Sequence, residues 1–416
     1  MRKFLILCCF LSSILLTGFS YPDAHEHEYS QCVCECGHFI ETDGEYIVLT
    51  SKVVSALGFG QEEILEIPET VTYEGENYTV TGIGASAFRN NITVKEIDLP
   101  RTLTYIGKYA FDGCENLQHV YMEEGVTYIG TAAFECCYSL QEVELPDSVE
   151  YIGDYAYNHC YSVSNEEIVL PRNLKRLGEN KGVLAHMFYD CGKDGVFRAF
   201  RIDENNKFYK TQDGILYTKD GSVLIFIPRG KIFQNDTYVM PQTVSALGEL
   251  SFSRNKNIKA VVLSDNLFVN GTMSSAERSL YRNRGNDLSV ACYAYTEVEQ
   301  YEARDSNSKY TSLDGVLYDK DMKTLIAIPL KYSGDLTIPE GVETWQKDAL
   351  WTEIDYCRDL SLNQIKKITI PDTLTIIDPE QVDAVNQMVD YYGTEIELGG
   401  ENPSFYKDGE GHLCVY

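Results

Sequence analysis

The sequence has few basic residues for its length. Lys and Arg together number 35 against 63 Asp and Glu, so the 416-residue chain carries a formal net charge of -28. A surface this acidic repels phosphate backbones and anionic lipids, which argues against binding to nucleic acid or to a membrane surface. Basic partners and divalent cations are the ligands that such a charge favours.

Catalytic signatures are also missing. The sequence contains no His-Glu-x-x-His, no phosphate-binding glycine loop and no Gly-x-Ser-x-Gly. Only seven histidines are present, and three of them fall in one N-terminal cluster, so the chain has few side chains suited to act as a general base. Carboxylate pairs are abundant, but in so acidic a chain they carry little information about a hydrolase site. We therefore expect no enzyme activity, with a carboxylate-based hydrolase as the remaining alternative.

Long apolar runs are confined to the first residues. A basic start at Arg2 and Lys3, an apolar run over residues 4–16 and small residues near Ser20 predict a secretory signal peptide over residues 1–20. No later stretch approaches the roughly 20 apolar residues that a membrane span needs. We expect a secreted or cell-surface protein with no membrane span after signal removal.

A 23-residue repeat is the strongest pattern in the sequence. Three features recur at this spacing: an Ile-Gly pair, an Ala followed by an aromatic ring, and a cysteine. The Ile-Gly pairs begin at Ile83, Ile106, Ile129 and Ile152. The rings are Phe88, Phe111, Phe134 and Tyr157. The cysteines are Cys114, Cys137 and Cys160.

The residues between these markers predict the shape of one unit. Each unit opens with a strand-like alternation such as Val143-Glu144-Leu145, and then enters a short helical or 3₁₀ piece that carries the Ala-aromatic pair. The glycine after each Ile fits a backbone that turns tightly. One unit cannot bury its own apolar residues, so neighbouring units must stack into one elongated core. The sequence therefore predicts a β-rich repeat solenoid with a parallel β-sheet along one face.

A second, longer repeat occupies the later part of the chain. Residues 206–228 match residues 307–329, and residues 402–416 look like a truncated third copy. In the first copy the linker 218–222 contains Asp-Gly between two apolar runs, which predicts a β-hairpin. We expect four segments: the signal peptide, a Cys/His-rich segment over 21–45, a regular array over 46–195, and an irregular array with hairpin inserts over 196–416.

The repeat unit resembles the BspA-type leucine-rich repeat of bacterial and some protist surface proteins. The resemblance covers roughly Ile64 to the C-terminus and is most specific between Leu65 and Leu170. It implies a leucine-rich-repeat solenoid, an extracellular or cell-surface location, and protein binding of the kind discussed as adhesion. It implies no catalytic residues and no particular ligand.

Residues beside the buried apolar pair of a solenoid strand point outward. Applied to the repeat, this rule predicts a mostly acidic strip on the sheet face, which we interpret as the contact surface for an extracellular protein or glycan. The alternative is a merely solvated surface on a structural cell-envelope spacer. The strip consists of Glu66, Glu96, Asp98, His119, Tyr121, Glu142, Glu144 and Glu167.

Two further rows recur with the repeat. Tyr105, Tyr128 and Tyr151 favour a packing ladder, with an aromatic contact stripe as the alternative. The three repeat cysteines favour a ladder of buried thiols, with a disulfide or metal role as the alternative.

The sequence contains one cluster of metal-ligand character. Cys32, Cys34, Cys36 and His38 would give Zn²⁺ a tetrahedral set of three thiolates and one imidazole. The C-x-C spacing is tighter than in usual zinc pairs, and an exported cysteine cluster equally forms disulfides. We expect no cofactor elsewhere in the chain.

Overall fold

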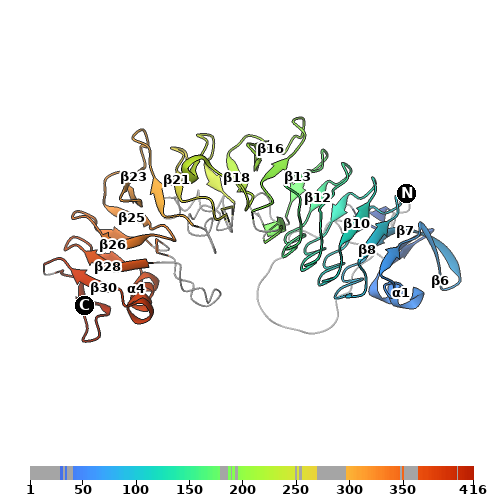
Figure 1. Cartoon of the computed structure of the whole chain (residues 1–416), viewed down its shortest axis with the longest axis horizontal. Helices are drawn as coiled ribbons and strands as arrows, with labels where there is room; N and C mark the ends of the chain where they lie inside the picture. Colours follow the sequence, from blue (N-terminus) through green and yellow to red (C-terminus); the bar gives the residue numbers. More distant parts are fainter. Residues whose placement is uncertain are drawn as a thin grey trace.

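The computed structural model describes residues 41–178, 186–188, 190–192, 195–248, 251–252, 255–268, 297–346, 349–350, 364–400 and 402–416, and the backbone of β1 (Tyr29–Ser30) and β2 (Val33–Cys34). The predicted signal peptide lies outside these residues. The described chain forms a long arch, with the N-terminal coils at one end and the C-terminal coils at the other (Figure 1).

The first row of parallel strands follows the apolar alternation of the sequence. In one of these strands Ile97 and Leu99 are buried, whereas Asp98 is exposed. The row consists of β5 (Ile64–Glu66), β8 (Glu96–Leu99), β10 (His119–Met122), β13 (Glu167–Val169), β15 (Ala199–Arg201), β19 (Thr237–Val239), β21 (Ala260–Val262), β22 (Gln300–Glu302), β26 (Ser333–Thr337), β28 (Gln364–Ile370) and β30 (Glu395–Leu398).

A second row of parallel strands includes the Tyr-Ile positions of the repeat. Tyr105, Tyr128 and Tyr151 occupy one register position on three neighbouring strands, as the period predicts. The row consists of β4 (Tyr46–Leu49), β7 (Glu76–Ile83), β9 (Tyr105–Ile106), β11 (Tyr128–Ile129), β12 (Tyr151–Ile152), β14 (Arg176–Leu177), β18 (Val223–Phe226), β20 (Ala246–Leu247), β25 (Thr324–Ala327), β27 (Thr344–Trp345) and β29 (Ile376–Ile377).

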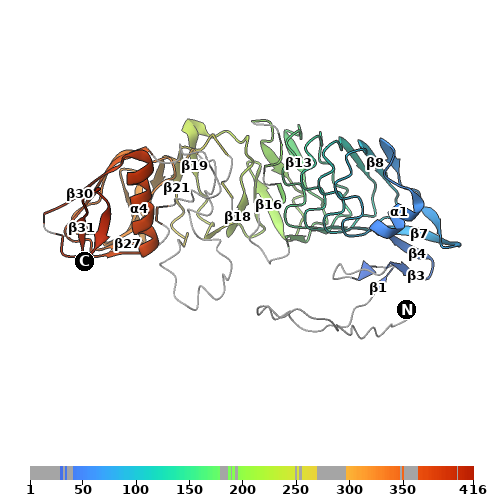
Figure 2. The same cartoon turned by 90° about the horizontal axis from the view of Figure 1, so that it is seen from below.

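The two rows lie on opposite flanks of the arch. In the view from below, β8, β13 and β19 follow one long edge, and β4, β7 and β27 follow the other (Figure 2). Turns connect the two rows on both the outer and the concave side of the arch (Figure 1). The first-row strand of each coil therefore lies on a flank of the arch, not on its concave side.

The first row is interrupted at the coil that contains Val143-Glu144-Leu145. The prediction of a strand there is wrong, since these residues form no β-strand hydrogen bonds with a neighbouring strand. The N–H of Val143 donates instead to the side-chain Oδ1 of Asn165, at 2.8 Å. Val143 itself remains buried, so the core continues without the strand.

The segment that carries the Ala-aromatic pair differs from coil to coil. At His186–Phe188 (η1) it is a 3₁₀ helix. In the regular coils it is a series of turns: the N–H of Ala110 donates to the Gly107 oxygen at 3.2 Å, and left-handed φ values of 57° at Tyr109 and 72° at Gly113 prevent a continuous helix. These turns add backbone hydrogen bonds between coils, such as the 2.8 Å bond from the Phe111 N–H to the Ala133 oxygen.

The repeat rings stack in file through the core. The centroids of Phe88, Phe111, Phe134 and Tyr157 follow one another at 5.3, 5.2 and 5.2 Å, and Phe188 continues the series at 5.6 Å. The interplanar angles are 12° or less. The prediction that neighbouring coils share one apolar core is thus confirmed.

The glycine after each repeat Ile is required for a reason other than the one expected. Gly107 and Gly130 do not have left-handed φ values, so a tight turn does not explain them. A Cβ on Gly130 would lie 2.6 Å from the Lys108 nitrogen and 2.7 Å from the Gly107 carbonyl carbon. Glycine is needed because the backbones of adjacent coils approach each other too closely for a side chain.

We expect Gly130→Ala to destabilise the regular coils by about 1–3 kcal/mol, the usual cost of overpacking, because rigid backbone blocks the added methyl group. Chemical denaturation with hydrogen exchange of the flanking coils measures this loss. Gly409→Ala is the control, since a Cβ there meets nothing within 4 Å. Equal stability of the two variants would contradict the close-approach explanation.

The hairpin units are integral to the solenoid. β16 (Tyr209–Gln212) and β17 (Ile215–Thr218) pair antiparallel, and β17 then pairs with β18, as the Asp-Gly linker predicts. β18 in turn pairs in parallel with β20, so the third strand of the unit takes a second-row position. β23 (Tyr310–Leu313) and β24 (Val316–Asp319) repeat this arrangement before β25. β31 (Phe405–Lys407) and β32 (Leu413–Val415) form the truncated copy.

A buried asparagine fastens two of these units to the coil before them. The Nδ2 of Asn206 donates to two carbonyl oxygens of the preceding coil at 2.9 and 2.8 Å. Its Oδ1 accepts two N–H groups of its own unit at 2.9 and 2.8 Å. Asn402 repeats this pattern, with amide bonds of 2.8 and 3.1 Å. This contact explains the Asn that opens the first and the third copy of the longer repeat, whereas in the second copy only the Oδ1 of Asn307 is hydrogen-bonded within the described residues.

Short elements close the two ends of the arch. α1 (Ser51–Leu57) is capped by the Thr50 hydroxyl and ends at Gly58, and β3 (Thr42–Asp43) and β6 (Thr70–Tyr73) form hairpins with second-row strands. α4 (Pro379–Tyr392) begins after Asp378, whose carboxylate accepts the Glu380 N–H. Its buried apolar face covers the last coils. A 3₁₀ turn, η2 (Gln234–Asp236), precedes β19.

Candidate binding surface

The first-row strands carry six of the eight residues of the predicted acidic strip, and the other two, Glu142 and Glu144, lie at the gap in the row. Glu66 stands opposite Asp98, and Asp98 stands opposite Tyr121 in the register of β5, β8 and β10. Glu96 stands opposite His119 in the same way. Exposed members are Glu66, Asp98, Tyr121, Glu144 and Glu167; half-buried members are Glu96, His119 and Glu142.

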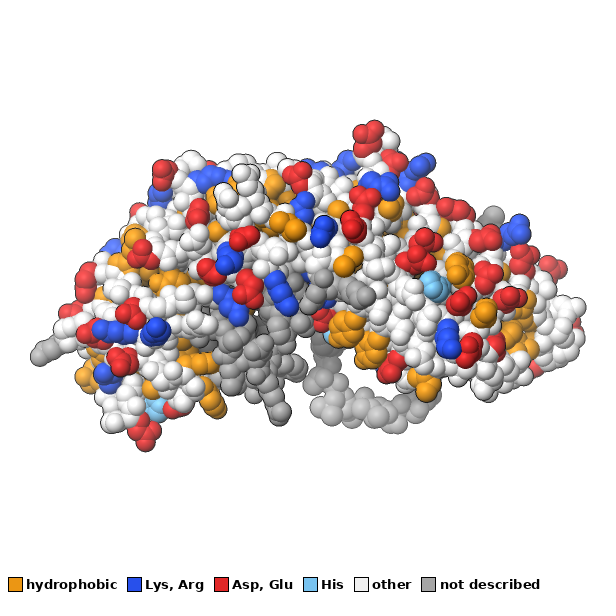
Figure 3. Space-filling view, in the orientation of Figure 1, with side chains coloured by type: hydrophobic (Ala, Val, Ile, Leu, Met, Phe, Trp, Pro, Cys, Tyr) orange, Lys and Arg blue, Asp and Glu red, His pale blue; other side chains and the backbone are white. Residues whose placement is uncertain are grey.

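Ion pairs divide the strip into two parts. His119 Nδ1 lies 3.2 Å from Glu142 Oε1, and Arg201 Nε donates to Glu167 Oε2 at 2.7 Å. By contrast, none of the other four acids forms an ion pair within the described part of the chain. These are Glu66, Glu96, Asp98 and Glu144. Acidic side chains crowd the N-terminal half of this face (Figure 3).

Unpaired carboxylates in adjacent strands raise the free energy of the folded chain. Like charges directly opposite one another across two strands destabilise the pair. Glu66 and Asp98 are such a pair, and both are exposed to solvent and to any partner. A basic surface docked on this face would relieve the repulsion.

The second-row tyrosines form a packing ladder, as predicted. The rings of Tyr105, Tyr128 and Tyr151 stack at 4.9 and 4.4 Å, and Tyr105 is buried. The Arg176 guanidinium lies over the Tyr151 ring at 5.4 Å, which closes the ladder with a cation–π contact. The exposed aromatic of the acidic strip is Tyr121, at 48 % exposure.

The repeat cysteines form the predicted ladder of buried thiols. The Sγ–H groups of Cys114, Cys137 and Cys160 donate to backbone oxygens of the preceding coil at 3.2, 3.3 and 3.3 Å. Burial raises the pKa of Cys114 to about 12, and it raises the pKa values of Cys137 and Cys160 well above their usual range. All three are free thiols.

We expect these buried thiols to resist alkylation in the folded protein, because the neutral thiol is a poor nucleophile and solvent does not reach it. Iodoacetamide at mild alkaline pH should modify the half-buried Cys136 and Cys414 long before Cys137. Peptide mass spectrometry with and without denaturant measures the order of labelling. Early modification of Cys137 in the native protein would contradict the ladder.

The candidate zinc ligands lie outside the described side chains. Cys32, Cys36 and His38 lie outside the described residues, and only the backbone of Cys34 falls within a strand. Within the described segments, no group of three or more His, Cys, Asp or Glu side chains is arranged to hold a metal ion.

Sequence reasoning missed a polar groove beside the strip. It measures about 390 Å³ and lies where the turns meet the first-row strands. A signal was present: positions 118, 141 and 164 carry Gln, Gln and Ser one repeat apart, and positions 139 and 162 both carry Ser. Polar recurrence next to a strand start was overlooked because the repeat was defined by its apolar positions.

A family model identifies the repeat. The model for the BspA-type leucine-rich repeat region matches residues 77–193 in six copies. Residues 77–193 are thus similar to a BspA-type leucine-rich repeat region. Its match spans the regular coils, where the stacked rings, the thiol ladder, most of the acidic strip and the polar groove all lie.

Three solved structures of bacterial proteins are similar to the chain at low sequence identity. A leucine-rich cell surface protein from Faecalibacterium prausnitzii is 18 % identical, with 82 % of this chain and 89 % of that chain covered and a TM-score of 0.43. A leucine-rich repeat protein from Eubacterium ventriosum is 16 % identical, with 84 % and 87 % covered and a TM-score of 0.45. The pneumococcal vaccine antigen PcpA is 16 % identical, with 82 % and 90 % covered and a TM-score of 0.47. A search of curated proteins finds no match.

The BspA-type region indicates a protein-interaction role at a coarse level, and such regions are generally non-catalytic. It names no ligand. No helix among the described residues is long and apolar enough to cross a bilayer.

Proposed function

We propose that the protein is a secreted or cell-surface interaction module, which holds an extracellular partner on the first-row face of its solenoid. The partner is a protein or a glycan-bearing protein with a basic surface. The eight strip residues form the contact surface, and Glu66, Glu96, Asp98 and Glu144 supply the attraction.

The observation that carries this proposal is the run of carboxylates without cation partners among the described residues. A merely solvated face gains nothing from acids placed opposite one another, whereas a binding face gains a steering field and a preference for positive charge. Tyr121 adds exposed aromatic area in the centre of the strip, which is a common anchor at protein interfaces.

The second candidate is a structural spacer in the cell envelope, for which the strip provides only solubility. Its support is the chain-wide acidity, since a net charge of -28 is spread over far more residues than the strip. A carboxylate-based hydrolase has weaker support, because the strip lies on an open flank without the enclosed site that catalysis requires.

Binding assays with extracellular-matrix proteins, mucins and polysaccharides test the proposal. We expect a basic ligand whose affinity falls as salt rises, because salt screens exposed charges. A strip variant with Glu66, Glu96, Asp98 and Glu144 replaced by Ser should bind at least about fivefold more weakly, since four solvent-accessible ion pairs to a partner contribute roughly 1–4 kcal/mol together.

The matched control removes the same number of charges elsewhere. Its four exposed acids lie off the first row and form no ion pair within the described segments: Glu45, Glu76, Asp321 and Glu340. It should bind like the wild type. Equal binding by the strip variant would refute the contact surface, and the absence of any ligand on the panel would favour the spacer.

A further inference from the structure

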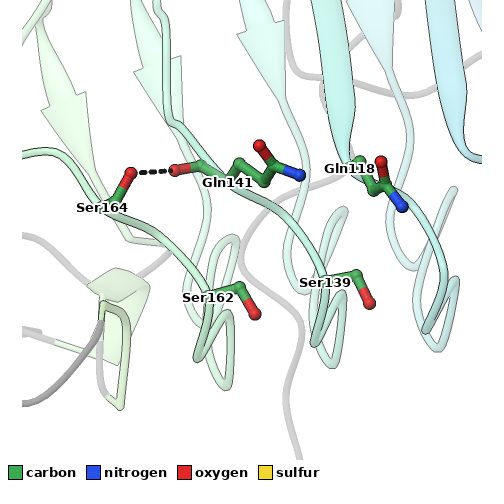
Figure 4. A pocket seen from close by; sticks show the side chains of 5 residues that line it. All are labelled: Gln118, Ser139, Gln141, Ser162 and Ser164. Atoms are coloured by element: carbon green, nitrogen blue, oxygen red, sulfur yellow. Dashed lines mark hydrogen bonds between the residues drawn. The ribbon is translucent and has the colours of Figure 1, made fainter.

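The polar groove has a composition unlike that of the acidic strip. Its lining is entirely uncharged and consists of Gln118, Ser139, Gln141, Ser162 and Ser164. The two glutamine amides form one row along the stack of coils, and the hydroxyls of Ser139 and Ser162 form a second row beside it (Figure 4). A backbone hydrogen bond joins the adjacent coils here, since the Gln141 N–H donates to the Gln118 backbone oxygen at 3.0 Å.

Most of these side chains have hydrogen-bonding capacity to spare. Ser164 uses its hydroxyl to donate to the Gln141 backbone oxygen at 3.1 Å. For the side chains of Gln118, Ser139, Gln141 and Ser162, no protein partner exists within the described segments. Each amide offers donors and an acceptor, and each hydroxyl offers both, so the groove presents a mixed array without charge.

The backbone of the groove is not free to pair with another strand. The N–H groups of Gln141 and Ser164 already donate to the coil before them, at 3.0 and 2.8 Å. Leu117, Leu140 and Val163 turn inward and are buried. The groove therefore lacks both the sheet edge and the apolar pockets by which extended peptides are recognised.

Two exposed rings stand next to the serine row. Tyr138 and Tyr161 immediately precede Ser139 and Ser162, and their rings stack 5.5 Å apart at 14°. They are 38 % and 45 % exposed. The rings are not among the lining residues, so they lie at the border of the groove, where an aromatic ring suits the C–H groups of a ligand with a polar hydroxyl rim.

We propose that this groove binds a neutral glycan, with successive pyranose units lying along the stack of coils. A pyranose unit is about as long as the roughly 4.8 Å spacing of neighbouring strands, so each sugar meets an equivalent set of groups. The glutamine amides and serine hydroxyls bond the sugar hydroxyls, and the two tyrosine rings, which stack on each other, contact the sugar at the border of the groove. This inference goes beyond the proposed function, because it uses different residues and an uncharged ligand.

The test uses an array of neutral gluco-, xylo-, manno- and N-acetylglucosamine oligosaccharides, followed by calorimetric titration of the best one. Binding should be insensitive to salt. Gln118→Ala with Gln141→Ala should weaken it about tenfold, which corresponds to about 1.4 kcal/mol and to the loss of about two hydrogen bonds. Tyr161→Ala should weaken it as well, whereas Tyr161→Phe should retain binding because it keeps the ring.

Two controls separate this site from the acidic strip. Gln61→Ala with Gln364→Ala removes two exposed amides elsewhere and should leave glycan binding unchanged. The strip variant should also keep glycan binding, and the groove variant should keep any salt-sensitive ligand of the strip. Circular dichroism melts confirm that the surface variants fold.

The proposal is overturned if no neutral oligosaccharide binds, or if the groove variant binds as the wild type does. Binding confined to charged oligosaccharides and abolished by salt would also overturn it. A peptide that competes in the groove and is lost in the same variant would assign the groove to peptides instead.

Discussion

Phe134→Ala is expected to lower the free energy of unfolding of the regular coils by about 3–5 kcal/mol. Phe134 is fully buried, and its ring lies 5.2 Å from the rings on both sides. Its truncation leaves a cavity in the middle of the file, where neither neighbouring coil can collapse without breaking its own backbone hydrogen bonds. Chemical denaturation monitored by hydrogen exchange of these coils measures the loss.

Two companion variants separate stacking from burial. Phe134→Leu keeps most of the apolar volume and should cost less than about 1.5 kcal/mol beyond the lost ring contacts. Tyr121→Ala removes an exposed ring from the first row and should change stability by no more than about 0.5 kcal/mol. If Phe134→Ala cost no more than Tyr121→Ala, the ring file would not be the core of the solenoid.

Asp190→Asn is expected to cost about 3–5 kcal/mol, because it leaves a buried guanidinium without its counter-charge. The Asp190 carboxylate is 4 % exposed and lies 3.4 Å from Nη1 of Arg229, whose side chain is 10 % exposed. It also lies 3.5 Å from Nδ1 of His159. These contacts join the regular coils to the first hairpin unit, so unfolding of that junction should separate from unfolding of the two ends.

The double variant Asp190→Asn with Arg229→Met provides the check. Removing both charges should restore much of the stability, since no uncompensated ion remains in the interior. Additive losses in the double variant would mean that the two side chains act independently. That result would contradict a coupled ion pair at the junction.

The acidic strip shows how much of a surface can be predicted from a periodic sequence. The alternation of the first-row strands predicted that Glu66, Asp98 and Tyr121 face outward, and the register of β5, β8 and β10 brings these three side by side. The ion pairs that neutralise part of the strip were not predictable. Arg201 reaches Glu167 only because β13 and β15 are neighbours, despite the long segment between them.

The sequence by itself determined the repeat, the shared core and the order of the coils. An apolar residue that recurs every 23 positions can be buried only between the equivalent residues of the adjacent coils. The period therefore specifies the stacked rings and the ladder of thiols. The Asp-Gly hairpins follow from local backbone preference in the same way.

Only the tertiary structure decided which polar groups of different coils meet. At the gap in the first row the Val143 N–H donates to the side chain of Asn165, and Gly130 is explained by its distance to the backbone of the preceding coil. Asp190 with Arg229 and the groove of glutamines and serines are likewise products of stacking. Apolar burial imposes a period that the sequence displays, whereas polar contacts depend on distances between coils that no single repeat encodes.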